Sequence, residues 1–154
     1  MLPGRGADPE AIAVVTGFNA LLGVELLGER DEAYHLELLV GPQHLHDAGG
    51  VHGGVYLSLL DIVMARAARM ALPPGSYMPT LELKTNFLAS VSQGRIHATG
   101  RVISRTTRTC YLEAELLSDT GRLLARASAT MIAPAPRSPE APAGGVPGAS
   151  AGVA

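Results

Sequence analysis

The sequence predicts an α+β fold in which an antiparallel sheet wraps around one long helix. The segment 53–72 contains no proline and is apolar nearly all round, which is typical of a buried helix. Segments on both sides of it alternate apolar with polar residues, as strands with one face on a core do. One long helix beside several strands joined by short turns favours an α+β layout.

The elements before the long helix are a shorter helix and a pair of strands. A helix is expected over 8–22, where apolar residues recur at helical spacing, with Asp8 at the N-cap and Pro9 in the first helical position. Two strands joined by a polar turn follow, at 23–28 and 33–40.

A glycine-rich loop over 41–54 leads into the long helix, and Pro73 and Pro74 end it. After this helix, apolar residues no longer recur at helical spacing but alternate with polar residues. Four strands are expected there, and the turn 118–121 joins the last two as a hairpin. They cover residues 80–88, 95–104, 109–117 and 122–132.

The 154 residues are expected to form one domain, over 1–133. Residues 134–154 consist mostly of Pro, Gly, Ala and Ser. Such a segment buries too little apolar surface to offset its ordering entropy. It is therefore expected to be a disordered tail.

Composition narrows the class of protein. Hydrophobic residues make up 47% and charged residues 17%, which suggests that a second copy of the chain covers part of the surface. A net charge of −2 argues against nucleic acid as a partner. The single cysteine, Cys110, is expected in buried packing. With no apolar run that spans a bilayer and no signal-peptide layout, a cytoplasmic protein without a membrane partner is expected.

The long helix carries one acidic residue, Asp61. Its neighbours at helical spacing include no cation; they are Leu57, Ser58, Met64 and Ala65. A carboxylate in apolar company is costly unless another group stabilises it or a reaction uses it. Asp61 is therefore a candidate general base or nucleophile. The alternative is a solvent-facing stripe that Asp61 shares with Ser58.

The segment Gly49–Gly54 leads directly into that helix. Glycines at a helix start leave backbone N–H groups reachable, and the helix dipole adds positive potential there. Such groups can stabilise an oxyanion during acyl transfer. No lysine follows, so the segment does not match a phosphate-binding loop. A tight turn that needs glycine for its conformation is the alternative.

These features together resemble a known family. His52-Gly53-Gly54, followed by Asp61 seven residues after Gly54, resembles the signature of the PaaI-like hotdog thioesterases of the phenylacetate-pathway and 4-hydroxybenzoyl-CoA types. The segments 80–88 and 119–125 resemble the same family, and the likeness covers roughly residues 10–133. It implies a hotdog fold and hydrolysis of an acyl-CoA, with coenzyme A as part of the substrate and no separate cofactor.

The resemblance also implies roles for particular residues. Asp61 is expected to act as nucleophile or as the general base that activates water. The N–H of Gly53, with that of Gly54, is expected to polarise the thioester carbonyl. His52 is expected to shape the loop and contact the substrate, and Thr80 to place the attacking water.

One position departs from the family. Relatives carry Asn or Gln six residues before His52, where this chain has His46. A neutral histidine can donate one hydrogen bond, much as an amide does, so His46 is a candidate replacement for it. His44 is expected to be a solvated loop residue. The three loop histidines have no standard zinc spacing, and no metal is expected.

The spacing of the two candidate groups predicts a dimer. Gly53 and Asp61 are eight residues apart on one helix, about 12 Å of rise. An oxyanion donor and a nucleophile must both lie about 3 Å from one carbonyl. Two chains with antiparallel helices would place Gly53 of one beside Asp61 of the other, giving two shared sites. The family commonly pairs such dimers into tetramers.

Other substrate contacts are expected from cations and aromatic residues. The nucleotide end of coenzyme A is expected near residues 104–108, and the candidates for it are Lys84, Arg101, Arg105, Thr107 and Arg108. The acyl group, whether aryl, phenylacetyl or medium-chain, has candidate contacts in Tyr56, Tyr77 and Phe87.

Two other functions stay open at this point. A hotdog dehydratase or hydratase would pair His46 or His52 with Asp61 for proton transfer at carbon. A non-catalytic acyl-CoA-binding module would have no use for the acid.

Overall fold

The computed structural model describes residues 15–72 and 76–133. The expected tail over 134–154, the expected helix start at Asp8 and Pro9, and Pro73 and Pro74 lie outside the described residues. The elements in chain order are α1 (Gly17–Leu22), β1 (Val24–Arg30), β2 (Ala33–Leu39), the 3-10 helix η2 (Pro42–His44), α2 (Gly53–Met70), β3 (Thr80–Phe87), β4 (Arg95–Arg105), β5 (Thr109–Ser118) and β6 (Leu123–Ile132).

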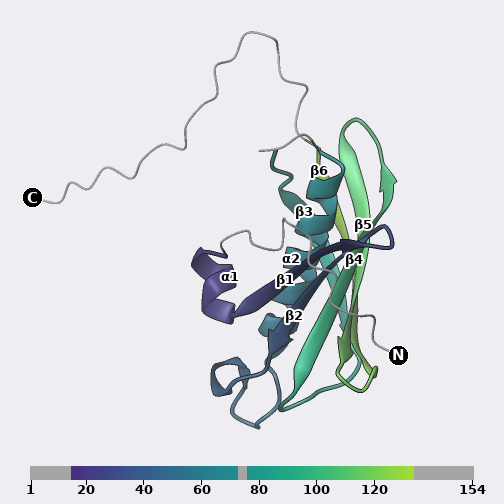
Figure 1. The fold of residues 1–154 in the computed structure, drawn as a ribbon. Helices are drawn as coiled ribbons and strands as arrows, with labels where there is room; N and C mark the ends of the chain where they lie inside the picture. The colour runs from purple at the N-terminus through teal and green to yellow at the C-terminus, as the bar shows by residue number, and fades with distance from the viewer. Residues whose placement is uncertain (1–14, 73–75, 134–154) are drawn as a thin grey trace, which may run out of the picture.

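The strands form one six-stranded sheet in the order β1-β2-β4-β5-β6-β3, and every pair is antiparallel. The long helix α2 packs against one face of this sheet (Figure 1). The predicted α+β fold, a sheet wrapped around one long helix, is therefore confirmed. Helix α2 connects β2, near one edge of the sheet, to β3. Strand β3 forms the opposite edge of the sheet, beside β6.

Small side chains allow α2 to lie directly on the sheet. Several inward-facing positions of the central strands are glycine or alanine: Ala98 and Gly100 in β4, Ala114 in β5, and Ala125, Ala127 and Ala129 in β6. A Cβ atom added to Gly100 would lie 2.9 Å from the backbone carbonyl of Val63 in α2. At this point the helix backbone therefore touches the strand backbone with no side chain between them.

Two expectations about local structure need correction. The first helix begins at Gly17, and Val15 and Thr16 are not helical, because Gly17 has a φ of 58° that a continuous right-handed helix does not allow. The turn between β1 and β2 is two residues rather than four. Asp31 and Glu32 both have positive φ, which is the geometry that a tight hairpin requires.

The expectation that α2 is buried all round is also wrong for one chain. One stripe of the helix faces the sheet and is buried: Val55, Tyr56, Leu59, Leu60, Val63, Met64, Ala67 and Ala68. The opposite side has no sheet over it, and Leu57 there is 41% exposed. Cys110 is buried in the core, as expected. In the described part of the chain, no helix is long and apolar enough to span a membrane.

Candidate active site

Asp61 lies on the side of α2 that the sheet does not cover, and its side chain is half-buried. The hydroxyl of Thr80, at the start of β3, donates a hydrogen bond of 2.8 Å to Oδ1 of Asp61. Among the described residues, no other group donates to this carboxylate. The structure thus brings Asp61 and Thr80 together, and it corrects the idea of a fully buried acid.

The first turn of α2 has four N–H groups that no helical carbonyl can accept. His52 is the N-cap, and its Nδ1 accepts the N–H of Gly54 at 2.9 Å. The N–H of Val55 donates to the carbonyl of His52 at 2.9 Å, and that of His52 itself donates to the carbonyl of His44 at 2.8 Å. Of these four residues, Gly53 alone has an N–H that no group in the described part of the chain accepts. The N–H of Gly54, which the resemblance suggested as a second oxyanion donor, donates to the imidazole of His52 in this structure.

Strand β3 links the two ends of the candidate site. Thr80 at its start contacts Asp61, and the ring of Phe87 at its end lies 3.5 Å from where a Cβ of Gly53 would be. The strand therefore runs beside α2 from the acid to the oxyanion donor. Gly53 and Asp61 stay about 12 Å apart along the helix, so one chain holds two separated halves of a site.

His46 is exposed and belongs to a tight loop. Its backbone N–H donates to the carbonyl of Gly50 at 2.9 Å, and its Nδ1 accepts from the N–H of Ala48 at 3.0 Å. Its Nε2 is left as the donor, and this atom and the hydroxyl oxygen of Ser90 both lie within 3 Å of where a Cβ of Gly50 would be. A neutral His46 therefore has one ring N–H, at Nε2, and its replacement of an amide stays a prediction.

His44 is not the solvated residue that was expected, because only 2% of it is exposed. Its Nε2 donates to the carbonyl of Leu22 and its Nδ1 accepts from the N–H of Gly41, both at 2.9 Å. All three loop histidines therefore use Nδ1 to accept a backbone N–H. In the described part of the chain, no cluster of three metal-ligating side chains is found.

The residues expected to hold coenzyme A are divided between two places. Arg105, Thr107 and Arg108 lie in or beside the β4–β5 hairpin, where Arg105 donates to the carbonyl of Ala71 just after α2. The register pairs Arg105 with Cys110, Cys110 with Met131 and Met131 with Thr80. This hairpin is therefore level with Thr80 and three strands away, about 14 Å.

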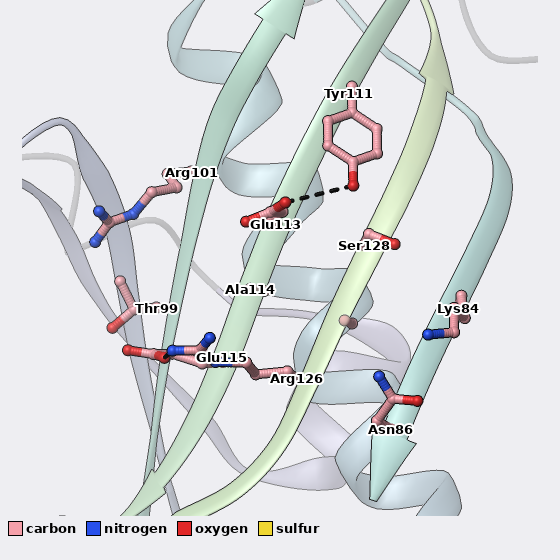
Figure 2. Close-up of a pocket in the computed structure, with 11 residues that line it drawn as sticks. Lys84, Asn86, Thr99, Arg101, Tyr111, Glu113, Ala114, Glu115, Arg126 and Ser128 are labelled. Carbon is pink, nitrogen blue, oxygen red and sulfur yellow. Dashed lines mark hydrogen bonds and ion pairs between the residues drawn. The ribbon is translucent and has the colours of Figure 1, made fainter.

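Lys84 and Arg101 lie elsewhere. Both line a groove of about 410 Å³ on the face of the sheet opposite α2 (Figure 2). Carboxylates also line it, and Glu115 pairs with Arg126 at 3.0 Å. The structure does not bring Lys84 or Arg101 together with Arg105, and the groove lies on the other face from Asp61.

The three aromatic residues expected around the acyl group do not form one pocket. Tyr56 is 2% exposed in the core, and burial raises the pKa of its hydroxyl, an effect that the backbone of Val91 opposes. Tyr77 and Phe87 are 72% and 55% exposed. Phe87, above Gly53, is the aromatic residue placed at a half-site.

The family model of the thioesterase superfamily matches residues 48–125, which include Gly53, Asp61 and Thr80. This chain belongs to the thioesterase superfamily. The expected hotdog fold and the expected resemblance to PaaI-like thioesterases are confirmed. Three relatives show the extent of this similarity.

A Mycobacterium tuberculosis protein, provisionally named an esterase, is 27% identical over 122 residues, which are 77% of this chain and 87% of that protein. Its solved structure superimposes with a TM-score of 0.74 at 26% identity and covers 79% of this chain and 98% of that one. A Ralstonia eutropha protein, provisionally described as a thioesterase related to phenylacetic acid degradation, has a TM-score of 0.72 at 27% identity and covers 78% and 92%.

The third relative is the phenylacetic acid degradation protein PaaI of Thermus thermophilus, in a variant form. It shares the fold, with a TM-score of 0.68 at 23% identity, and covers 75% of this chain and 97% of that one. The family and these relatives support a thioester hydrolase in broad terms.

Proposed function

We propose that this protein hydrolyses acyl-CoA thioesters, with Asp61 as nucleophile or general base and the N–H of Gly53 as oxyanion donor. The observation that carries the proposal is the state of these two groups. Asp61 is held by one hydroxyl and is otherwise open, and Gly53 keeps the first-turn N–H that no described group accepts. A carboxylate can serve as the base or nucleophile of thioester hydrolysis, and a free N–H at a helix start can stabilise its oxyanion.

The chemistry follows from these positions. As a general base, Asp61 takes a proton from water while the water oxygen adds to the thioester carbonyl. The hydroxyl of Thr80 donates its hydrogen bond to Asp61, so the lone pairs of the hydroxyl oxygen are available to accept a hydrogen bond from that water. The N–H of Gly53 stabilises the negative oxygen of the tetrahedral intermediate. The C–S bond then breaks, and the leaving sulfur takes the proton that Asp61 received from water, which regenerates the carboxylate.

As a nucleophile, Asp61 itself adds to the carbonyl. The thiolate leaves, and an acyl–aspartyl anhydride forms, which water hydrolyses in a second step. Both routes use the same two groups of the protein and give the same products.

Two copies of the chain are part of the proposal, because the two halves are about 12 Å apart on one helix. The edge strand β3 supports it, since Leu81 and Phe87 on this strand are 63% and 55% exposed. Leu57, on the uncovered side of α2, adds a third exposed apolar residue beside the half-sites. A second copy that covers this face would place its Asp61 near Gly53 of the first. Pairing of such dimers into a tetramer is proposed from the family likeness.

The nucleotide end of coenzyme A is proposed to bind at Arg105, Thr107 and Arg108. The hairpin that holds them is level with Thr80 on the sheet, which supports this placement. Lys84, on the opposite face, is not included in this contact.

A proline substitution tests the oxyanion donor, because Gly53→Pro replaces the N–H in question by a ring carbon that cannot donate. Proline is tolerated in the first helical position, and His52 already has a ψ of 137°, which a following proline prefers. We expect kcat for acyl-CoA hydrolysis to fall by roughly 10²–10³-fold. The matched control, Gly53→Ala, keeps the N–H and adds a Cβ at an ordinary 3.5 Å from Phe87, so it should stay active.

The acid and the shared site are tested together. Asp61→Asn is expected to lower kcat by roughly 10²–10⁴-fold. When inactive Asp61→Asn and Gly53→Pro chains are mixed and allowed to re-associate, half of the dimers contain one chain of each kind. In such a mixed dimer, one shared site has both defects and the other site has neither. The mixture should then recover about one quarter of wild-type activity. No recovery in verified mixed dimers would contradict the shared site, and near-full activity of Asp61→Asn would contradict the proposed chemistry.

The same assays separate the two alternatives. A hydratase would add water to an enoyl-CoA without releasing free thiol, whereas a thioesterase releases it. In the described chain neither His46 nor His52 contacts Asp61, and the Nδ1 of each is already occupied. A binding module would hold acyl-CoA without turnover and would be unaffected by Asp61→Asn.

A further inference from the structure

We propose that His44 is a positioning residue that fixes the oxyanion donor of this enzyme without touching the substrate. The inference rests on the proposed function, because it concerns the N–H of Gly53. His44 is buried, and both nitrogens of its ring are hydrogen-bonded to backbone groups from two different segments.

The ring of His44 joins the glycine-rich loop to α1. Nε2 donates to the carbonyl of Leu22, the last residue of α1, at 2.9 Å. Nδ1 accepts the N–H of Gly41, at the start of the loop, at 2.9 Å. A neutral imidazole is the side chain that offers one donor and one acceptor on opposite edges of a rigid ring. His44 is thereby held between two backbone segments 19 residues apart, Leu22 and Gly41.

The backbone of His44 carries this fixed position to the helix start. Its carbonyl accepts the N–H of His52 at 2.8 Å. His52 is the N-cap of α2, and its own ring holds the N–H of Gly54 at 2.9 Å. Gly53 lies between these two bonded residues, so the direction of its N–H is set by His52 on one side and Gly54 on the other.

The rest of the loop closes around this chain of contacts. Val51 donates to the carbonyl of Val91 at 2.8 Å and forms a bridge with Leu45. These contacts hold the residues on either side of His44 and His52, and among the described residues the only hydrogen bond from the loop to α1 is the one from the His44 ring. Loss of the ring contacts would free the loop from α1 and let His52 shift with it.

The test replaces His44 by Phe, which keeps a ring of similar shape without the two hydrogen bonds. A small misplacement of a catalytic group can cost roughly hundredfold in rate, so we expect kcat to fall by about tenfold to hundredfold. KM should stay near its wild-type value, because an oxyanion contact is made in the transition state. His44→Asn can still accept from Gly41 and His44→Gln can still donate to Leu22, so each should recover part of the lost kcat.

A matched control separates positioning from general loss of stability. Ser118 is also a buried polar residue, and its hydroxyl accepts from Arg122 at 3.1 Å in the β5–β6 turn. Ser118→Ala should lower Tm and leave kcat unchanged, whereas the His44 variants should lower kcat at temperatures where circular dichroism shows them folded. Where His44→Phe does not fold, His44→Asn is measured in its place.

A double variant decides how His44 acts. In the Gly53→Pro background the N–H is already absent, so adding His44→Phe should lower kcat no further. If the two substitutions lower kcat independently in the double variant, or if folded His44 variants keep wild-type kcat, the proposed role of His44 is wrong. Either result leaves the oxyanion assignment of Gly53 unaffected. Full activity of Gly53→Pro would overturn the oxyanion assignment of the proposed function, and the role of His44 with it.

Discussion

Gly100 is the point where the structure can be tested most directly by one added methyl group. A Cβ in Gly100→Ala would lie 2.9 Å from both the carbonyl carbon and the oxygen of Val63, and 3.1 Å from the nitrogen of Met64. Ordinary contact begins at 3.4 Å, so the added atom is 0.5 Å too close to backbone that no rotamer change can move. The helix α2 must therefore shift away from β4.

Two opposing effects set the expected size of the change. Alanine restricts the unfolded chain more than glycine does, which stabilises the fold by about 0.4–1 kcal/mol where the native conformation allows it. Overpacking of a well-packed core costs about 1–3 kcal/mol. The steric term is larger, so Gly100→Ala should be destabilised by up to about 2.5 kcal/mol, a Tm lower by roughly 10 °C at most.

The measurement is urea and thermal unfolding followed by circular dichroism, at a fixed protein concentration because of the proposed dimer. Gly53→Ala is the matched control, since its Cβ meets only Phe87 at an ordinary 3.5 Å. It should unfold at the wild-type midpoint or above. Wild-type or higher stability of Gly100→Ala would refute the direct contact between the β4 and α2 backbones.

Three further predictions concern other residues. Thr80→Val removes the donor to Asp61 and should lower kcat about tenfold, whereas Thr80→Ser should stay close to wild type in the same thiol-release assay. Arg108→Gln should raise KM about twofold to fivefold for acyl-CoA but not for a short thioester without the nucleotide. Burial lowers the pKa of His35 in the folded chain below its ordinary value of 6.5. As pH falls below 6.5, the unfolded chain therefore binds a proton at this histidine more readily than the folded chain does. The free energy of unfolding should decrease over this range. In His35→Gln, urea midpoints should depend less on pH over this range, and an unchanged dependence would contradict the assignment to His35.

The sequence predicts the long helix well and places two candidate groups along it, because both inferences depend on local patterns. The apolar run that becomes α2, the glycines before it and Asp61 within it all lie in one continuous segment. Helical spacing alone then separates Gly53 from Asp61. No local pattern predicts the contact between Thr80 and Asp61, because 19 residues separate them. Only the resemblance to the thioesterase family indicates a role for Thr80 in the same site.

The errors arise where a distant contact or a local irregularity decides the outcome. His44 reads as a loop residue, because nothing near it in the sequence reveals that its ring reaches Leu22. Strict alternation along β4 would place Arg101 and Arg105 on the same face of the sheet. A bulge between Val102 and Ser104 reverses this, so that Arg101 faces the outer groove and Arg105 pairs with the buried Cys110 beside α2.

The position of α2 on the sheet couples the two halves of the proposed site. The same rigid helix carries Gly53 at its start and Asp61 two turns later, and the backbone contact at Gly100 lies beyond both, at Val63. A displacement of the helix therefore moves the oxyanion donor of one site and the acid of the other together. In a symmetric dimer both sites would change equally, whereas loosening the loop at His44 would move the donor and leave the acid in place. Gly100→Ala and His44→Phe thus perturb the same reaction through different elements. Because both displace the N–H of Gly53, their combined effect on kcat should be smaller than the product of the single effects.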